Sequence, residues 1–207
     1  PASRQKIDFS LTRDNIELKK VPYWGLDNNI GYIRLTKFSK NSDRDFKKAL
    51  LELNENNLEG LIIDLRGNSG GLLNVAKNIL EYFTNRGELL FTQKGKTNRS
   101  NKEYISRRKP LIDEDIPIIV LVDKNSASAS EIVSGSLQDL DRAIILGQKT
   151  FGKGLVQHIY DLNDEISIRI TTAKYYLPSG RIIQKQDYLN NGFLTDGLDK
   201  NDSTFIT

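Results

Sequence analysis

The sequence predicts an α/β fold of mixed sheet layers packed against helices, with a β-rich part at the C-terminal end. Two observations carry this prediction. A unit of apolar strand, tight turn and amphipathic helix begins at residue 61 and recurs at residue 116. After Gly147 the apolar residues alternate with polar ones, which is the period of half-buried strands. Strands that alternate with helices are typical of layered folds with some parallel pairing.

The composition describes one globular domain and excludes several kinds of protein. A chain of 207 residues with 38% hydrophobic and 28% charged residues can build a core of ordinary size. No apolar run approaches the length of a membrane span. The 30 basic and 27 acidic residues are well mixed, so the net charge of +3 does not indicate a nucleic acid as a partner. The absence of Cys excludes disulfides, thiolate metal sites and cysteine nucleophiles.

The first elements are two strands and a helix. Alternating apolar residues predict a strand over residues 7–11 and another over residues 30–35. Ser42 is expected to be the N-cap of a helix whose apolar residues recur at helical spacing until Asn56.

The two repeated units follow. The first has a buried strand over residues 61–65, a glycine-rich turn, and a helix whose stripe consists of Leu72, Val75, Ala76, Ile79, Leu80 and Phe83. The second has a strand over residues 116–123 and a helix over residues 131–140, which runs into a short strand ending at Gly147.

The remaining segments are less regular. The polar segment 94–109 is expected to form an exposed hairpin or loop. Alternation predicts strands over residues 155–160 and 165–177, and a further strand over residues 181–184 after the turn at Pro178.

The stretch "KNSASASE" (residues 124–131) presents three serines where a strand turns into a helix. A serine nucleophile requires such a turn, a base that takes its proton, and N–H groups aimed at the oxyanion. A helix N-terminus supplies oriented N–H groups. The alternative is that small residues let the helix pack closely on the sheet. The residues alone do not choose between Ser126, Ser128 and Ser130.

Two residues are candidates for the base. His158 is the only histidine, but it lies in an alternating strand, where a structural or surface imidazole is more common than a catalytic one. Lys153 lies between two glycines in "TFGKGLVQ", with apolar neighbours that would help to keep its amine neutral. Gln157 is four positions further on, so in a strand it shares a face with Lys153 and can orient the amine.

The turn "DLRGNSGG" (residues 64–71) is a third candidate part of a site. Gly67, Gly70 and Gly71 before a helix can form a turn lined by N–H groups, which suits an oxyanion or a phosphate. The turn lacks the final Gly-Lys-Ser/Thr of a phosphate-binding loop. A helix entry that requires positive φ is the alternative explanation.

Five motifs occur in the order of one known family. They are "GYIRLTKF", "DLRGNSGG", "NSASASEI", "DRAIILGQKTFGKGLVQ" and "YYLPSGRIIQ". Together, from Phe9 to Gln184, they resemble the carboxy-terminal processing peptidases, also called tail-specific proteases. The resemblance implies a crotonase/ClpP-like protease core and a serine endopeptidase that needs no metal and no cofactor.

The resemblance also implies roles for single residues. Ser128, the middle serine, matches the nucleophile, and Lys153 matches the general base. Gln157 matches the glutamine that orients the lysine. The oxyanion hole of the family corresponds to the N–H of Ala129 together with that of a glycine in "DLRGNSGG". Gly70 is preferred over Gly71, and Glu131 matches a supporting acidic residue.

Two departures from the family concern the turns, and two concern the ends. Asn125 stands where the family often has Gly, and Asn68-Ser69 stands where it has Asn-Pro or a glycine run. Residues 1–16 resemble the last strand and exit segment of a PDZ domain, so residues 17–207 are expected to be the peptidase core with a truncated C-terminal end. A chain that begins with Pro and lacks Met fits an excised piece.

The expected partners are a polypeptide substrate with an accessible C-terminus and, in the full-length protein, a PDZ domain. The family resemblance implies an extracytoplasmic location. Two alternatives remain at this point. One is a crotonase-like acyl-CoA enzyme, because the folds are related. The other is a non-catalytic ligand-binding relative, such as the retinoid-binding members. Retention of Ser128, Lys153 and Gln157 together speaks against both.

Overall fold

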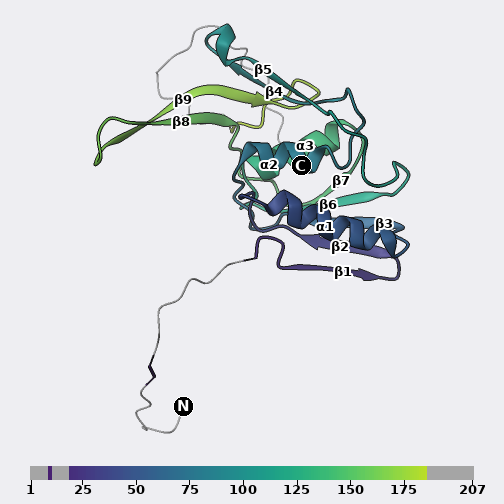
Figure 1. Cartoon of the computed structure of the whole chain (residues 1–207). Coiled ribbons are helices and arrows are strands. Elements are labelled where there is room, and N and C mark those ends of the chain that lie inside the picture. The colour runs from purple at the N-terminus through teal and green to yellow at the C-terminus, as the bar shows by residue number, and fades with distance from the viewer. Residues whose placement is uncertain (1–8, 11–18, 186–207) are drawn as a thin grey trace.

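The α-helices α1, α2 and α3 lie between two β-sheets (Figure 1). The computed structural model describes residues 9–10 and 19–185. The helical segments are α1 (Ser42–Glu55), α2 (Leu73–Leu80), the short 3-10 helix η1 (Asn98–Ser100) and α3 (Ala129–Asp139). The first sheet consists of β1 (Tyr23–Asp27), β2 (Ile30–Arg34), β3 (Gly60–Asp64), β6 (Ile118–Val122) and β7 (Ile144–Gly147). The second sheet consists of β4 (Leu89–Gly95), β5 (Lys102–Ile105), β8 (Leu155–Asp161) and β9 (Ser167–Tyr176).

The first sheet has the strand order β1-β2-β3-β6-β7. The strands β2, β3, β6 and β7 are parallel, and β1 pairs antiparallel with β2. Alternate residues of these strands are buried, among them Ile33, Ile63 and Val120. Because the side chains of a strand point alternately to its two faces, these residues form one layer of the core against the helices. The mixed α/β architecture that the sequence predicts is confirmed.

The parallel strands bring two turns to the same edge of the sheet. The turn after β3 carries "RGNSGG", and the turn after β6 carries "KNSASAS". The carboxyl ends of neighbouring parallel strands lie side by side, so β3 and β6, paired from Leu61–Ile118 to Asp64–Leu121, place these turns next to each other. This edge is where α/β proteins commonly bind ligands.

The second sheet has the order β5-β4-β9-β8, and its strands are antiparallel. Segment 94–109 forms the end of the β4–β5 hairpin, as the sequence predicts. The β8–β9 hairpin extends beyond the helices on one side of the molecule (Figure 1). Strand β8 forms one edge of this sheet.

Several predicted boundaries are wrong for identifiable reasons. The N-cap of α1 is Asn41, in the left-handed conformation at φ 71°, and not Ser42. The Ser42 hydroxyl instead bonds the backbone of Ser39, which closes the preceding turn. Leu72 is not part of the buried stripe of α2, because it is the extended N-cap residue and is 47% exposed. Residues 181–184 form only an isolated bridge between Tyr176 and Ile182.

Three further strands went unrecognised in the sequence, and one prediction is untested. Strands β1, β4 and β5 were not separately predicted, because each mixes polar residues or glycine into its apolar pattern. The predicted strand over residues 7–11 lies outside the described residues except for Phe9 and Ser10. Within the described part, no helix has the length and apolar character needed to span a membrane.

Candidate active site

The structure distinguishes the three serines of the turn before α3. Ser126 and Ser130 are fully buried, and both hydroxyls donate at 2.8 Å to backbone carbonyls, those of Leu65 and Asn68. Ser128 between them is partly accessible. Since a nucleophile must reach its substrate, the structure favours Ser128, and the outer serines have structural roles.

Ser128 has an unusual backbone conformation. Its φ is 56° and its ψ is −111°, outside the regions that residues with a Cβ ordinarily adopt. It is the N-cap residue of α3, and its amide N–H donates to the carboxylate of Glu131 at 2.7 Å. A strained residue persists only where its surroundings hold it, and such residues are often found at functional sites.

Glu131 is the residue that joins the two halves of the candidate site. Its carboxylate is fully buried and accepts four hydrogen bonds. Oε2 accepts from the backbone N–H of Ser128 at 2.7 Å and from that of Lys153 at 2.9 Å. Oε1 accepts from the Thr150 hydroxyl at 2.7 Å and from the Gly152 N–H at 2.6 Å. One carboxylate oxygen therefore holds the backbones of both Ser128 and Lys153.

The loop that carries Lys153 is fixed from both sides. On one side, the Phe151 N–H donates to the Ser126 carbonyl at 3.0 Å. On the other side, Gly152 has φ 84°, and a Cβ on it would lie 2.8 Å from the Cβ of Lys185. Glycine is therefore required at position 152, both for its backbone conformation and for this close approach.

Asn68 connects the turn "RGNSGG" to the serine turn. It is fully buried, and its side chain donates to the Leu35 carbonyl at 2.8 Å. Its backbone carbonyl accepts from the Ala127 N–H at 3.1 Å and from the Ser130 hydroxyl at 2.8 Å. A single residue thus ties β2, the glycine turn and the start of α3 together.

Backbone N–H groups beside Ser128 can form an oxyanion hole. Gly70 lies directly against Ser128, because a Cβ on it would be 2.9 Å from the Ala129 nitrogen and 3.0 Å from the Ser128 Cβ. Its own N–H, however, donates to the Asn68 side chain at 2.9 Å. Among the residues that the structure describes, no acceptor binds the N–H of Gly71 or of Ala129. This pattern favours Gly71 over the preferred Gly70 as the glycine that donates.

No hydrogen bond joins the side chains of Lys153 and Gln157 in this structure. The Lys153 side chain is exposed, and within the described residues its ammonium group has no hydrogen bond or ion pair. The expected apolar enclosure is incomplete, since Phe151 is 59% exposed. The amide of Gln157 donates to the Thr171 hydroxyl at 3.4 Å. The roles of both residues therefore stay predictions.

His158 lies away from the serine turn, on the β8–β9 hairpin. Its ring is exposed and shares a hydrogen bond of 2.9 Å with the Thr172 hydroxyl. Within residues 9–10 and 19–185, no three side chains of His, Asp or Glu gather closely enough to hold a metal ion.

Three residues of the site scaffold were missed in the sequence, namely Asn68, Asp123 and Thr150. The Asp123 carboxylate accepts from the N–H groups of Gly67, Asn125 and Ser126, each at 3.0 Å. Its position at the end of an apolar strand was a usable signal, because Asp in that place commonly bonds the following turn. Asn68 and Thr150 act through partners that are distant in sequence, so no local pattern identifies them.

A second polar cluster lies beside the glycine turn, on the face of the first sheet that the helices leave open. Asp64 is fully buried and receives two hydrogen bonds from the Arg66 guanidinium, at 2.9 and 2.8 Å. The Tyr32 hydroxyl donates to it at 2.6 Å. Burial by itself raises the pKa of Asp64, but the hydrogen bonds from Arg66 and Tyr32 outweigh it and hold the pKa at about 2.

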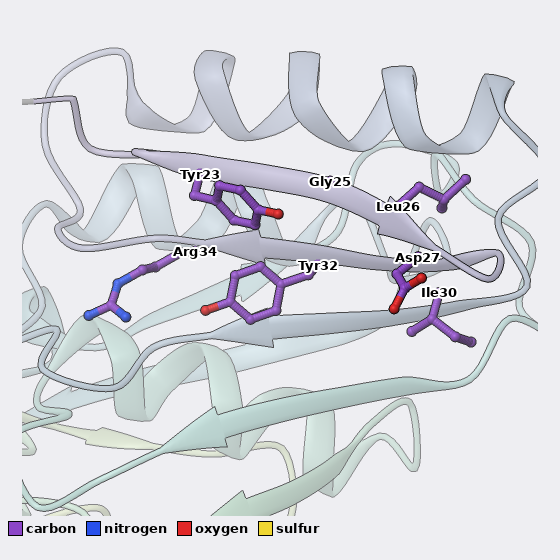
Figure 2. A pocket seen from close by; sticks show the side chains of 7 residues that line it. All are labelled: Tyr23, Gly25, Leu26, Asp27, Ile30, Tyr32 and Arg34. Atoms are coloured by element: carbon purple, nitrogen blue, oxygen red, sulfur yellow. The ribbon is translucent and has the colours of Figure 1, made fainter.

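Figure 2 shows the side chains that line an open pocket over the paired strands β1 and β2. Its volume is about 440 Å³, and Tyr23, Ile30, Tyr32 and Arg34 are among its lining residues. None of the predicted site residues lines it. The pocket is therefore separate from the candidate active site.

Asp64 is expected to make the stability of the protein depend on pH in acid. Its pKa falls from 3.8 to about 2 on folding, so its stabilising contribution is complete above 3.8 and is lost as the pH falls to about 2. Thermal unfolding should therefore show a steeper loss of stability over this range for the wild type than for Asp64→Asn. Equal slopes for the two proteins would contradict this assignment.

Comparison with known proteins gives the chain a family context. Residues 29–193 match the sequence model of Peptidase family S41. The carboxy-terminal-processing protease of Bartonella bacilliformis is 41% identical over 182 residues, which cover 86% of this chain and 41% of that protein. The carboxy-terminal processing protease CtpB of Bacillus subtilis is 35% identical over 193 residues, which cover 90% of this chain and 39% of that protein.

A solved structure agrees with these sequence relatives. The photosystem II D1 C-terminal processing protease superposes with a TM-score of 0.72 at 30% identity, over 84% of this chain and 47% of that one. The chain thus spans about two fifths of the length of the curated relatives described above.

Proposed function

Because the chain belongs to peptidase family S41, we propose that it is the protease core of a serine-type, carboxy-terminal processing peptidase in which Ser128 is the nucleophile and Lys153 the general base. The observation that carries the proposal is the carboxylate of Glu131, which bonds the backbone N–H of both residues with one oxygen. A similar fold alone supports a shared reaction only by analogy. The hydrogen bonds of Glu131, in contrast, involve the proposed nucleophile and the proposed base themselves.

The first half of the proposed reaction forms an acyl-enzyme. The neutral amine of Lys153 takes the proton of the Ser128 hydroxyl as its oxygen attacks the carbonyl carbon of the scissile peptide bond. The carbonyl oxygen becomes an oxyanion, which accepts hydrogen bonds from the N–H groups of Ala129 and Gly71. The tetrahedral intermediate collapses, the C–N bond breaks, and the ammonium of Lys153 returns the proton to the leaving amine.

The second half releases the new C-terminus. The amine of Lys153 takes a proton from a water molecule, and the hydroxide attacks the ester carbon. The ester bond to Ser128 breaks, and the serine oxygen takes the proton back from Lys153. The reaction requires no metal and no cofactor, and each proton that leaves Ser128 or water passes through the same amine.

An ammonium group has no lone pair and cannot accept a proton, so the proposal requires that the Lys153 amine be neutral when it acts. Removal of water from this exposed side chain favours the neutral form. A bound polypeptide that lies over the loop of residues 151–154 would exclude water from the amine. Gln157 is then placed to orient it, once its amide leaves Thr171. Substrate binding and activation of the base are coupled in this scheme.

The partners and location of the longer protein are also part of the proposal. Relatives named carboxy-terminal processing proteases are more than twice as long as this chain. We infer a polypeptide substrate with an accessible C-terminus, a PDZ domain elsewhere in the full-length protein, and an extracytoplasmic location. Residues 1–207 should turn over peptides more slowly or less selectively than a form that includes the proposed PDZ domain.

A crotonase-like acyl-CoA enzyme is the second candidate that the fold permits. Such an enzyme uses N–H groups for an oxyanion but works through carboxylates. The carboxylate of Glu131 bonds the backbone of Ser128 and Lys153, and four donors already occupy it. Glu131 is therefore poorly suited to act as the acid or base of such a reaction.

Cleavage of an unstructured polypeptide tests the proposal. Ser128→Ala and Lys153→Ala should each lower kcat/KM by at least about a thousandfold, since nucleophile and base act as a unit. In the wild type, kcat/KM should rise with pH, because an amine accepts a proton only in its neutral form.

Ser126→Ala and Ser130→Ala are the matched controls. Ser130→Ala removes the hydrogen bond to the Asn68 carbonyl, and Ser126→Ala removes the bond to the Leu65 carbonyl and the one from the Asp123 N–H. Each lost bond costs about 1 to 3 kcal/mol in stability, and both variants should retain cleavage at temperatures where the protein stays folded. Undiminished cleavage by Ser128→Ala would contradict the assignment.

A further inference from the structure

Strand β8 presents an edge that no other strand occupies within the described part of the chain. The second sheet ends with β8, which pairs only with β9. Natural proteins usually cover or charge such edges, because unpaired N–H and C=O groups attract another strand. An uncovered edge beside a candidate active site is therefore a candidate binding surface.

The direction of the backbone groups along β8 follows from two hydrogen bonds. The Tyr175 N–H donates to the Gly154 carbonyl, and the Leu162 N–H donates to the Ile166 carbonyl, each at 2.8 Å. In an antiparallel pair, alternate residues bond the partner strand. The register shifts between Val156 and Gln157, so Thr172 of β9 has no partner residue in β8. The extra residue lies in β9, so in β8 every second residue still bonds the partner strand. The intervening residues direct N–H and C=O groups at the open edge. They are Leu155, Gln157, Ile159 and Asp161.

One face of the β8–β9 hairpin is apolar and exposed. Tyr160 pairs with Ile168, and His158 pairs with Ile170, on the same side of the hairpin. The apolar side chains of this side are between 43% and 61% exposed, and they are Tyr160, Leu162, Ile166, Ile168 and Ile170. A two-stranded hairpin is only marginally stable alone in water, so an added strand that covers part of this surface would stabilise it.

The edge is continuous with the candidate site. β8 begins at Leu155, two residues after Lys153, whose N–H shares the Glu131 oxygen with that of Ser128. A chain that is extended along β8 therefore leads to the loop that carries the base. This position is also where the proposed mechanism requires that water be excluded from Lys153.

We propose that polypeptide substrates bind in extended conformation as an added strand along the free edge of β8, with the backbone groups of Gln157 and Ile159 as hydrogen-bond partners. This inference rests on the proposed peptidase function and adds to it the mode of substrate binding. Strand addition reads the backbone of the substrate, so it selects unfolded polypeptide and excludes folded protein. The apolar side of the hairpin favours apolar side chains in the substrate.

A scan of singly N-methylated peptides tests the proposal with the unaltered protein. A strand that is bonded along one edge donates every second N–H group. On one side of the cleaved bond, methylation at alternate residues should lower kcat/KM about five- to tenfold, with little effect at the residues between them. Sensitivity without this period of two would overturn the proposal.

A proline in β8 tests the same contact from the side of the enzyme. The N–H of Ile159 faces the open edge, so Ile159→Pro removes a donor without breaking a bond to β9. KM for a long peptide should rise about five- to tenfold in Ile159→Pro, and less in Ile159→Ala, which loses the side chain but keeps the N–H. Equal KM values for the two variants would count against strand addition.

Two further measurements separate this inference from the proposed function. A small activated ester does not extend along β8, so its hydrolysis by the wild type, and its loss in Ser128→Ala, report on the catalytic site alone. If the ester is cleaved but the methylation scan shows no period of two, only the mode of binding is wrong. Sedimentation of the wild type and Ile159→Pro tests a second copy of the chain as the occupant. Self-association that is lost in Ile159→Pro, with KM unchanged, would overturn the proposal.

Discussion

Replacement of Glu131 by alanine is expected to abolish polypeptide cleavage and to lower the free energy of unfolding by more than about 3 kcal/mol. The change leaves four donors without their acceptor, namely the N–H groups of Ser128, Gly152 and Lys153 and the Thr150 hydroxyl. Each unsatisfied buried group costs about 1 to 3 kcal/mol. Urea unfolding and peptide cleavage measure the two effects.

Two milder variants separate the positioning role of Glu131 from a general loss of folding. Glu131→Gln keeps one carbonyl oxygen, which can still bond one of the two pairs of donors. Thr150→Val removes only the hydroxyl bond to Oε1 and leaves the shared Oε2 intact. Thr150→Val should cost about 1 to 2 kcal/mol in stability and retain most of the cleavage activity. Glu131→Gln should fold, and its kcat should fall by a larger factor than its KM rises.

The pattern across these variants decides the role of Glu131. A loss of kcat in Glu131→Gln, at a temperature where both variants are folded, indicates that the carboxylate aligns Ser128 with Lys153. Equal kcat for Glu131→Gln and the wild type would contradict this role and leave Glu131 as a structural residue only.

Gly71→Ala is the second substitution for which a large effect is expected. Gly71 has φ 146°, and a Cβ on it would lie 1.9 Å from the carbonyl oxygen of Phe38. That carbonyl accepts the Leu72 N–H at 2.6 Å, so it cannot move without breaking a backbone bond. The clash and the strained φ together should cost more than about 3 kcal/mol and displace the N–H that we assign to the oxyanion hole.

Gly67→Ala is the matched control within the same turn. Gly67 has φ 73°, but nothing lies within 4 Å of a Cβ placed on it. Only the backbone strain applies there, at about 1 to 2 kcal/mol. The unfolding temperature of Gly71→Ala should therefore be well below that of Gly67→Ala. Cleavage should be lost in Gly71→Ala and kept in Gly67→Ala. The reverse order would contradict the geometry of the turn.

The elements that the sequence predicted well are those whose own residues carry the signal. The segments 61–65 and 116–123 consist mostly of apolar residues, and they form the centre of the first sheet as β3 and β6. Strand β1 was missed because none of its five residues is buried, so its sequence carries no apolar pattern of a half-buried strand.

In the candidate site too, some features could be predicted from the sequence and others could not. The resemblance singled out Ser128, whose role as nucleophile stays a prediction. The structure adds that the hydroxyls of Ser126 and Ser130 are buried against carbonyls of the glycine turn. The preference for Gly70 over Gly71 could not be decided from the sequence. It depends on the hydrogen bond from the Gly70 N–H to the Asn68 side chain, and two adjacent glycines look alike without it.

The central claim is that Ser128 forms the acyl-enzyme, and the most direct test is to locate the acyl group. The protein is mixed with an activated ester of a short peptide and quenched in acid, and the labelled fragment is identified by mass spectrometry. One acyl group is expected on Ser128, none on Ser126 or Ser130, and no labelling of that fragment in Ser128→Ala. Labelling of another serine, or turnover of the ester by Ser128→Ala at the wild-type rate, would contradict the claim.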